Sequence, residues 1–199
     1  MAMSQTRTVA LAVVVFLSAS QAVAASGDLR SAAIQRGDLP AGFNGPLQKR
    51  YAHYTSFYDA NPACYLVALG RLGDDPRDRH WTQALTQLWG TRGTDGQTGT
   101  LGLCAYKYST VSQARTAFAH AAQLFENLPA SVPIAYRYRT VHVRTVGDQT
   151  AASQTKGFQQ LVFRRGSFMI GLHLSFMPHN MRMPFLVQVA TAINRRLKV

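Results

Sequence analysis

The chain has 199 residues, of which 47% are hydrophobic and 15% are charged, and its 21 basic residues outnumber 9 acidic ones for a formal net charge of +12. This length fits one domain that can bury a substantial core, and the charge should attract polyanions, anionic lipid headgroups or acidic partners. No second long apolar stretch follows the N-terminus, so we expect the rest of the chain to be soluble.

The N-terminus is predicted to be a secretory signal peptide over residues 1–24. Arg7 is the only charged side chain before nine apolar residues (9–17), and Ala22-Val23-Ala24 forms a small-residue cleavage site. A permanent membrane span needs about 20 apolar residues, so this segment is short for an anchor. An uncleaved anchor or a buried helix stays an alternative. Cleavage would leave a single exported domain over residues 25–199, secreted, periplasmic or associated with the cell envelope.

In the first half of the mature chain, Asp28 is expected to cap a short helix that ends near Gly37. Aromatic residues over 47–59 predict a first strand. Residues 61–72 fit either a second strand or a short buried helix. Asp75 and Pro76 are expected to start a helix that continues to residue 90, with Trp81, Leu85, Leu88 and Trp89 on one face. A polar loop (91–100) and a strand (101–109) follow.

The clearest helix is expected over residues 110–128, because Thr110 and Gln113 have the spacing of a capping box. A strand (134–145) and a loop (146–157) are predicted next. Residues 158–163 and 167–176 should then pair as a hairpin, and a last helix is expected over about 183–197. Helices separated by runs of strands predict an α+β fold, a single domain whose antiparallel β-sheet has its helices packed mainly on one face.

The longest apolar patterns of the chain come from two helical stripes and one strand face. Their residues are expected to be buried together as the core: Phe118, Phe125, Phe168, Ile170, Leu172, Leu174, Leu186, Val189 and Ile193. In the hairpin, Arg165 and Gly166 are predicted to form a two-residue turn. Arg164 and Arg165 should then project into solvent without an acidic partner, so the hairpin has a structural role and a basic tip.

The two cysteines, Cys64 and Cys104, are predicted to form a disulfide, because an even count in an oxidising compartment favours pairing. Two buried free thiols and a reactive nucleophile are the alternatives. No cysteine-hydrolase signature surrounds either residue.

Other catalytic patterns are missing from the sequence. The single glutamate, Glu126, and aspartates placed mostly in turns do not form the pair that a carboxylate-based hydrolase needs. The histidines show no H-x-x-x-H or H-x-H spacing, although His142 and His173 could meet across a sheet as two metal ligands without a third. Nucleophile-elbow and P-loop motifs are also absent. We therefore expect no cofactor, no metal and no catalytic residue.

Basic and aromatic residues alternate in several predicted strands, and after Glu126 ten basic residues face Asp148 alone. Alternating basic and aromatic residues are typical of sheets that stack single-stranded bases, but an export signal argues against a nucleic-acid ligand. The charge could also reflect an arginine-rich genome or solubility. The candidate anion-binding surface consists of Arg137, Arg139, Arg164 and Arg165.

Several short motifs occur in an order that resembles a group of uncharacterised exported bacterial α+β domains, some secreted and some attached as lipoproteins. They include DLPAGF (38–43), TVSQARTAF (110–118), VGDQT (146–150), LVFRRGSFMIGLHL (161–174) and VATAINRRL (189–197). More remotely, the layout is similar to PsbP-like and kinase-sensor-type extracellular domains. The resemblance implies a binding role without catalysis and assigns no functional residue.

These observations predict an exported, non-catalytic envelope domain that binds a ligand or partner through a basic surface. The partner would be an anionic envelope component or an acidic protein, with membrane contact only through the signal segment or surface charge. The alternative is a secreted enzyme of unrecognised type that uses Cys104 or a histidine in a cleft.

Overall fold

The computed structural model describes residues 28–51, 81–92, 98–126, 139–155, 157–175 and 182–198. The predicted signal peptide, Cys64 and the segment 61–72, Arg137 and Phe176 lie outside the described residues. Predictions about them stay predictions.

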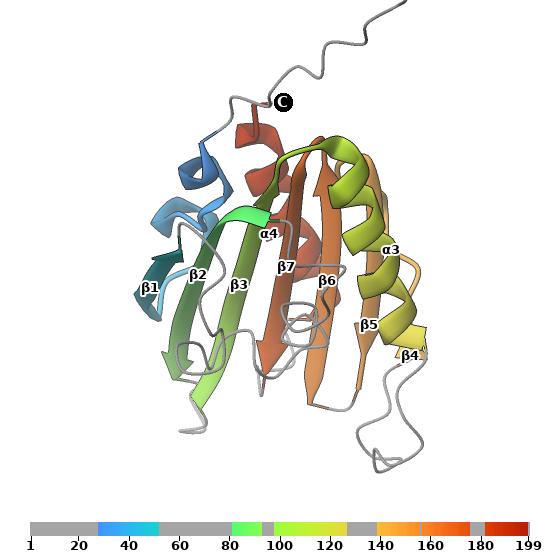
Figure 1. Cartoon of the computed structure of the whole chain (residues 1–199). Coiled ribbons are helices and arrows are strands. Elements are labelled where there is room, and N and C mark those ends of the chain that lie inside the picture. Colours follow the sequence, from blue (N-terminus) through green and yellow to red (C-terminus); the bar gives the residue numbers. More distant parts are fainter. Residues whose placement is uncertain are drawn as a thin grey trace, which may run out of the picture.

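Seven strands form one sheet in the order β1-β2-β3-β7-β6-β5-β4, and every neighbouring pair is antiparallel (Figure 1). The strands are β1 (Phe43–Tyr51), β2 (Trp81–Arg92), β3 (Thr98–Tyr108), β4 (Arg139–Thr140), β5 (Gln149–Gln154), β6 (Phe158–Arg165) and β7 (Phe168–Ser175). The α+β prediction with an antiparallel sheet in a single domain is therefore confirmed.

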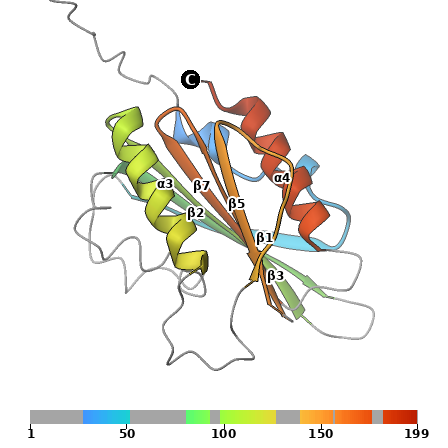
Figure 2. The ribbon, with the colours of Figure 1, turned by 90° about the vertical axis from the view of Figure 1, so that its right-hand side faces the viewer.

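Helices cover both faces of the sheet (Figure 2). The short 3-10 helices η1 (Leu29–Ala32) and η2 (Arg36–Asp38) and the helix α4 (Met183–Arg196) lie on one face, as expected for most helices. The longest helix, α3 (Val111–Glu126), lies on the other. Because β7 is covered on both sides, all eight of its residues are buried.

The sheet separates two hydrophobic cores. All nine predicted core residues are buried, but Phe118 and Phe125 pack with α3. The other seven pack on the α4 side with the buried residues of η1. The expectation of one common core is wrong, because alternate residues of the central strands point to opposite faces and each face has its own helix.

The start of α3 is fixed by the predicted capping box. The Gln113 backbone N–H donates to Thr110 Oγ1, and the Thr110 N–H donates to Gln113 Oε1, each over 3.2 Å. Ala114, Phe118 and Ala121 then form a buried stripe. Small alanines on this face let the helix lie close to the sheet.

The helix predicted to run up to residue 90 is wrong in its described part, because this segment is β2. Residues four apart share a face in a helix and also in a strand of period two, so the spacing of Leu85 and Trp89 fits both structures. Both side chains are buried in the α4-side core. A register shift between Trp81 and Gln83 places Trp81 in the core under α3 instead.

The loop predicted over residues 146–157 is also wrong, because it contains β5. The sequence QTAASQ lacks the alternating large apolar residues that indicate a strand, and its strand structure comes from pairing with β6. Of the strand predicted over 134–145, the described part forms only the two-residue β4.

The β6–β7 hairpin is confirmed, although its turn lies one residue later than predicted. Arg165 pairs with Phe168, so Gly166 and Ser167 form the two-residue turn. Gly166 has a φ of 54°, the left-handed conformation that glycine adopts without a steric penalty.

Candidate functional site

The hairpin tip does not display Arg164 to solvent. This side chain is buried, and its Nη1 lies 2.9 Å from Asp148 Oδ2. Its Nε donates to Gln149 Oε1 over 2.7 Å, and its Nη1 donates to the Gly166 carbonyl over 2.8 Å. The prediction of a solvated arginine without an acidic partner is therefore wrong.

The VGDQT motif (146–150) holds the hairpin tip in place. Asp148 also accepts a 2.8 Å hydrogen bond from the Gly166 N–H, and its own N–H donates to the Arg164 carbonyl. Gly147 has a φ of 68°, and a Cβ at this position would lie 2.5 Å from the Arg164 carbonyl oxygen. Two separate motifs of the sequence thus form one structural clamp.

The remaining predicted anion-binding residues lie apart from one another. Arg165 is half-buried on the α4 side, where its Nη1 donates to Asn194 Oδ1 over 3.3 Å. Arg139 is exposed on β4 at the edge of the sheet. Arg137 lies outside the described residues. Of the three residues that the structure describes, Arg164 is used in the clamp, while Arg165 and Arg139 lie on different strands of the sheet.

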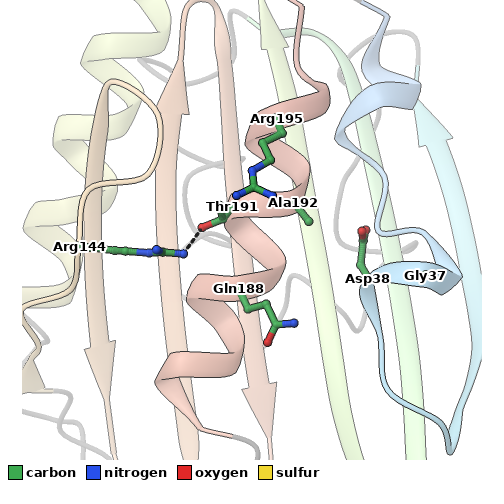
Figure 3. Close-up of a pocket in the computed structure, with 7 residues that line it drawn as sticks. All are labelled: Gly37, Asp38, Arg144, Gln188, Thr191, Ala192 and Arg195. Atoms are coloured by element: carbon green, nitrogen blue, oxygen red, sulfur yellow. Dashed lines mark hydrogen bonds between the residues drawn. The ribbon is translucent and has the colours of Figure 1, made fainter.

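A pocket of about 220 Å³ lies on the outer face of α4, between this helix, η2 and the chain that follows β4 (Figure 3). The side chains of Arg144 and Arg195 are both turned toward Thr191. The pocket is lined by Gly37, Asp38, Arg144, Gln188, Thr191, Ala192 and Arg195. Since the Arg144, Gln188 and Arg195 side chains are exposed, the pocket opens to solvent.

The helical period of α4 explains this arrangement. Leu186, Val189 and Ile193 turn to the core, so Gln188, Thr191 and Arg195 are left on the outer face. The sequence-based site did not include them. The polar stripe opposite the predicted core face was the signal that could have identified them.

Hydrogen bonds position one of the two pocket arginines. Arg144 Nη2 donates to Thr191 Oγ1 over 3.0 Å, while the Thr191 hydroxyl donates to the Val187 carbonyl over 2.6 Å. The hydroxyl proton is thereby used within the helix, and its oxygen is free to accept from the guanidinium. Thr191 therefore holds Arg144 in place across the outer face of α4.

The pocket's acidic residue is already neutralised. Both Asp38 carboxylate oxygens accept 2.7 Å hydrogen bonds from Arg196, and Oδ2 also accepts from the Gln35 N–H. This carboxylate is almost fully buried, with 8% of its side chain exposed. Arg144 and Arg195 form no ion pair with any acidic residue that the structure describes. The local charge facing solvent is therefore positive.

The enzyme alternative named Cys104 or a histidine in a cleft. Cys104 and His173 lie on the same sheet face, but both are buried. The His173 Nε2 has no hydrogen-bond partner, so this nitrogen does not activate a thiol. Burial lowers the pKa of His173 from 6.5 to about 4. His142 is exposed beside the edge strand β4, three strands away from β7, so the two histidines do not meet.

Among the residues that the structure describes, no three histidine, cysteine or acidic side chains gather as a metal site would require. Within the same ranges, no helix has the length and apolar character needed to cross a bilayer.

Comparisons with known proteins leave the family open. No family model matches the chain, and no curated protein matches it. Among solved structures, it is similar to the extracellular domain of PknH from Mycobacterium tuberculosis, with 11% identity and a TM-score of 0.47. The match covers 77% of this chain and 84% of that domain.

Proposed function

We propose that this protein is an exported, non-catalytic domain that binds an anionic component of the cell envelope through a basic surface on its α4 side. The observation that carries the proposal is the unequal pairing of charges around α4. Asp38 at the pocket is matched by Arg196, and Asp148 at the hairpin tip is matched by Arg164. Arg144 and Arg195 remain exposed beside them without an acidic partner in the described structure.

The charge distribution along the chain supports the same proposal. Ten basic residues and one acidic residue follow Glu126, and this part of the chain supplies α4 and the segment that contains Arg144. Their summed field would draw an anionic surface toward this side of the molecule. Export rests on the signal-peptide pattern of residues 1–24, and retention near the envelope would follow from the charge.

The test is co-sedimentation of the mature protein (25–199) with vesicles of phosphatidylglycerol, with phosphatidylcholine vesicles as the neutral comparison. We expect binding only to the anionic vesicles. It should weaken as the salt concentration rises from about 0.1 to 1 M, because the screening length falls from about 10 to 3 Å. Equal binding to both vesicles, or none to either, would contradict the proposal.

A matched pair of variants locates the surface. Arg195→Ala removes one exposed charge beside α4 and should weaken vesicle binding. Arg115→Ala removes an exposed arginine on α3, on the opposite face of the sheet, and should have a smaller effect. An equal loss in both variants would show that binding depends on overall charge rather than on the α4 side.

A further inference from the structure

We infer that the pocket between Arg144 and Arg195 binds a phosphomonoester group, the terminal phosphate of a larger molecule. This inference rests on the proposed function and names the chemical group that the α4 side recognises. It depends on the pocket's size, on its hydrogen-bond donors and on the neutralised acid at its wall.

The size of the pocket limits the ligand to a headgroup. Its volume of about 220 Å³ is below the roughly 300–1,000 Å³ that encloses a drug-sized molecule. The exposed side chains at its rim leave it open, so the rest of a longer ligand can stay in solvent. A single anionic group with a few attached atoms fits such a site.

The donors available in the pocket suit several oxygen atoms at once. The Arg195 guanidinium forms no hydrogen bond with any described residue, and the Arg144 guanidinium uses only Nη2, toward Thr191. Gln188 adds an exposed amide on the same helix face. One guanidinium can satisfy both oxygens of a carboxylate, whereas a phosphate has three terminal oxygens and can accept from two guanidinium groups together. The two converging arginines therefore favour phosphate (Figure 3).

Two nearby features could repel an anion, and neither prevents binding. The Asp38 carboxylate is paired through both oxygens with Arg196, so the wall that it forms has no net negative charge. The C-terminal end of α4 carries a partial negative charge, but its effect fades within the last turn. Arg195 lies in that turn, and Gln188 and Thr191 lie before it.

Isothermal titration of the mature protein with glycerol 3-phosphate tests the inference, with acetate as the carboxylate comparison. We expect saturable binding of the phosphomonoester and at least about tenfold weaker binding of acetate. Arg144→Ala and Arg195→Ala should each weaken phosphate binding by about tenfold or more, because each removes charge-assisted hydrogen bonds. Arg115→Ala on α3 should leave it unchanged.

Two subtler variants separate positioning from charge. Thr191→Val removes the oxygen that accepts from Arg144 while keeping the side-chain shape and the net charge, so it should weaken phosphate binding. Arg144→Lys keeps the charge but loses the planar, bidentate donor, and should also bind more weakly. Thermal melting of each variant checks that the fold is intact. Full binding by the folded double variant Arg144→Ala/Arg195→Ala would overturn the inference.

Competition distinguishes the two sources of such a phosphate. If glycerol 3-phosphate displaces the protein from phosphatidic acid vesicles, the pocket holds a lipid headgroup; if it binds without displacing the protein, the ligand is a free phosphorylated molecule. Either result supports a phosphomonoester site. Binding to phosphatidylglycerol vesicles without any binding of glycerol 3-phosphate would overturn this inference and leave the proposed function standing. Failure of both assays would overturn both.

Discussion

At the hairpin tip, two neighbouring arginines have different environments and should contribute differently to stability. Arg164 is buried and forms hydrogen bonds and an ion pair with the VGDQT segment, whereas Arg165 is half-buried and has one 3.3 Å hydrogen bond, to Asn194. Their adjacency in the sequence gives no sign of this difference. It arises because successive residues of a strand point to opposite faces of the sheet.

We expect Arg164→Ala to lower the free energy of unfolding by about 1–3 kcal/mol, because it leaves Gln149 and the Gly166 carbonyl without their donor. Asp148 moderates the loss, since 44% of its side chain is exposed and water can solvate it. Arg165→Ala should cost less than about 1 kcal/mol. Urea unfolding of both variants provides the measurement. A larger loss of unfolding free energy from Arg165→Ala than from Arg164→Ala would contradict the stabilising role of Arg164 in the clamp.

His173 gives a second prediction at the residue scale, because burial lowers its pKa to about 4. The unfolded chain, with a pKa near 6.5, binds the proton more readily between these values. The free energy of unfolding should therefore fall as the pH drops from about 6.5 to 4, by roughly 3 kcal/mol once the window is crossed. Above pH 6.5 this group should contribute no pH dependence.

Urea unfolding at several pH values from 7 to 4 checks this prediction. The carboxylates are the same in the wild type and in each histidine variant, so their contribution cancels when the free energies of unfolding are compared. His173→Gln removes the titrating group, so the free energy of unfolding of this variant should fall less between pH 6.5 and 4 than that of the wild type. His142→Gln, at an exposed position, should keep the wild-type slope. A wild-type slope in His173→Gln would show that other groups cause the acid sensitivity.

At the scale of the element, the sequence predicts those segments whose pattern fits only one secondary structure. The alternation in β7 and the capped stripe of α3 are confirmed, and so is the core face of α4. The pattern of β2 fits a helix equally well, and β5 has almost no apolar pattern. For both, the pairing with neighbouring strands decides the structure, and a single sequence does not show that pairing.

The candidate site was less predictable than the fold for a related reason. The arginines that the sequence drew attention to are adjacent or alternate, whereas those of the pocket are Arg144 and Arg195, which lie 51 positions apart in the chain. They line one pocket because the chain after β4 passes along the outer face of α4, where Arg144 donates to Thr191. Beforehand, only the excess of positive charge in this half of the chain and the polar stripe of the last predicted helix pointed toward them.

The buried strand β7 provides a test at this scale. Leu172→Ala should lower the free energy of unfolding by about 2–5 kcal/mol, because Leu172 is fully buried in the α4-side core. The control is Leu47→Ala on β1, where 75% of the residue is exposed and the loss should stay near or below about 0.5 kcal/mol. Equal losses in chemical denaturation would show that β7 does not organise the core.

At the scale of the whole molecule, the predicted disulfide would join the central sheet to a distant part of the chain. Cys104 is buried on β3 beneath α3, while Cys64 lies outside the described residues. Closing a loop of about 41 residues would stabilise the fold by roughly 4 kcal/mol in the chain-entropy model. Alkylation of the unfolded, unreduced protein followed by mass spectrometry should find no labelled thiol, and labelling of both cysteines would contradict the prediction.

The strand order has a consequence for how the protein is made. The sheet consists of two consecutive runs of strands, β1-β2-β3 and β4-β5-β6-β7, joined only where β3 pairs with β7. During synthesis β3 is complete at Tyr108, but its partner begins only at Phe168. Until then β3 has an open edge that could pair with the same strand of another nascent chain. Keeping the chain unfolded until its last third has emerged would avoid that risk, and the export that we propose would provide such a delay if it precedes folding.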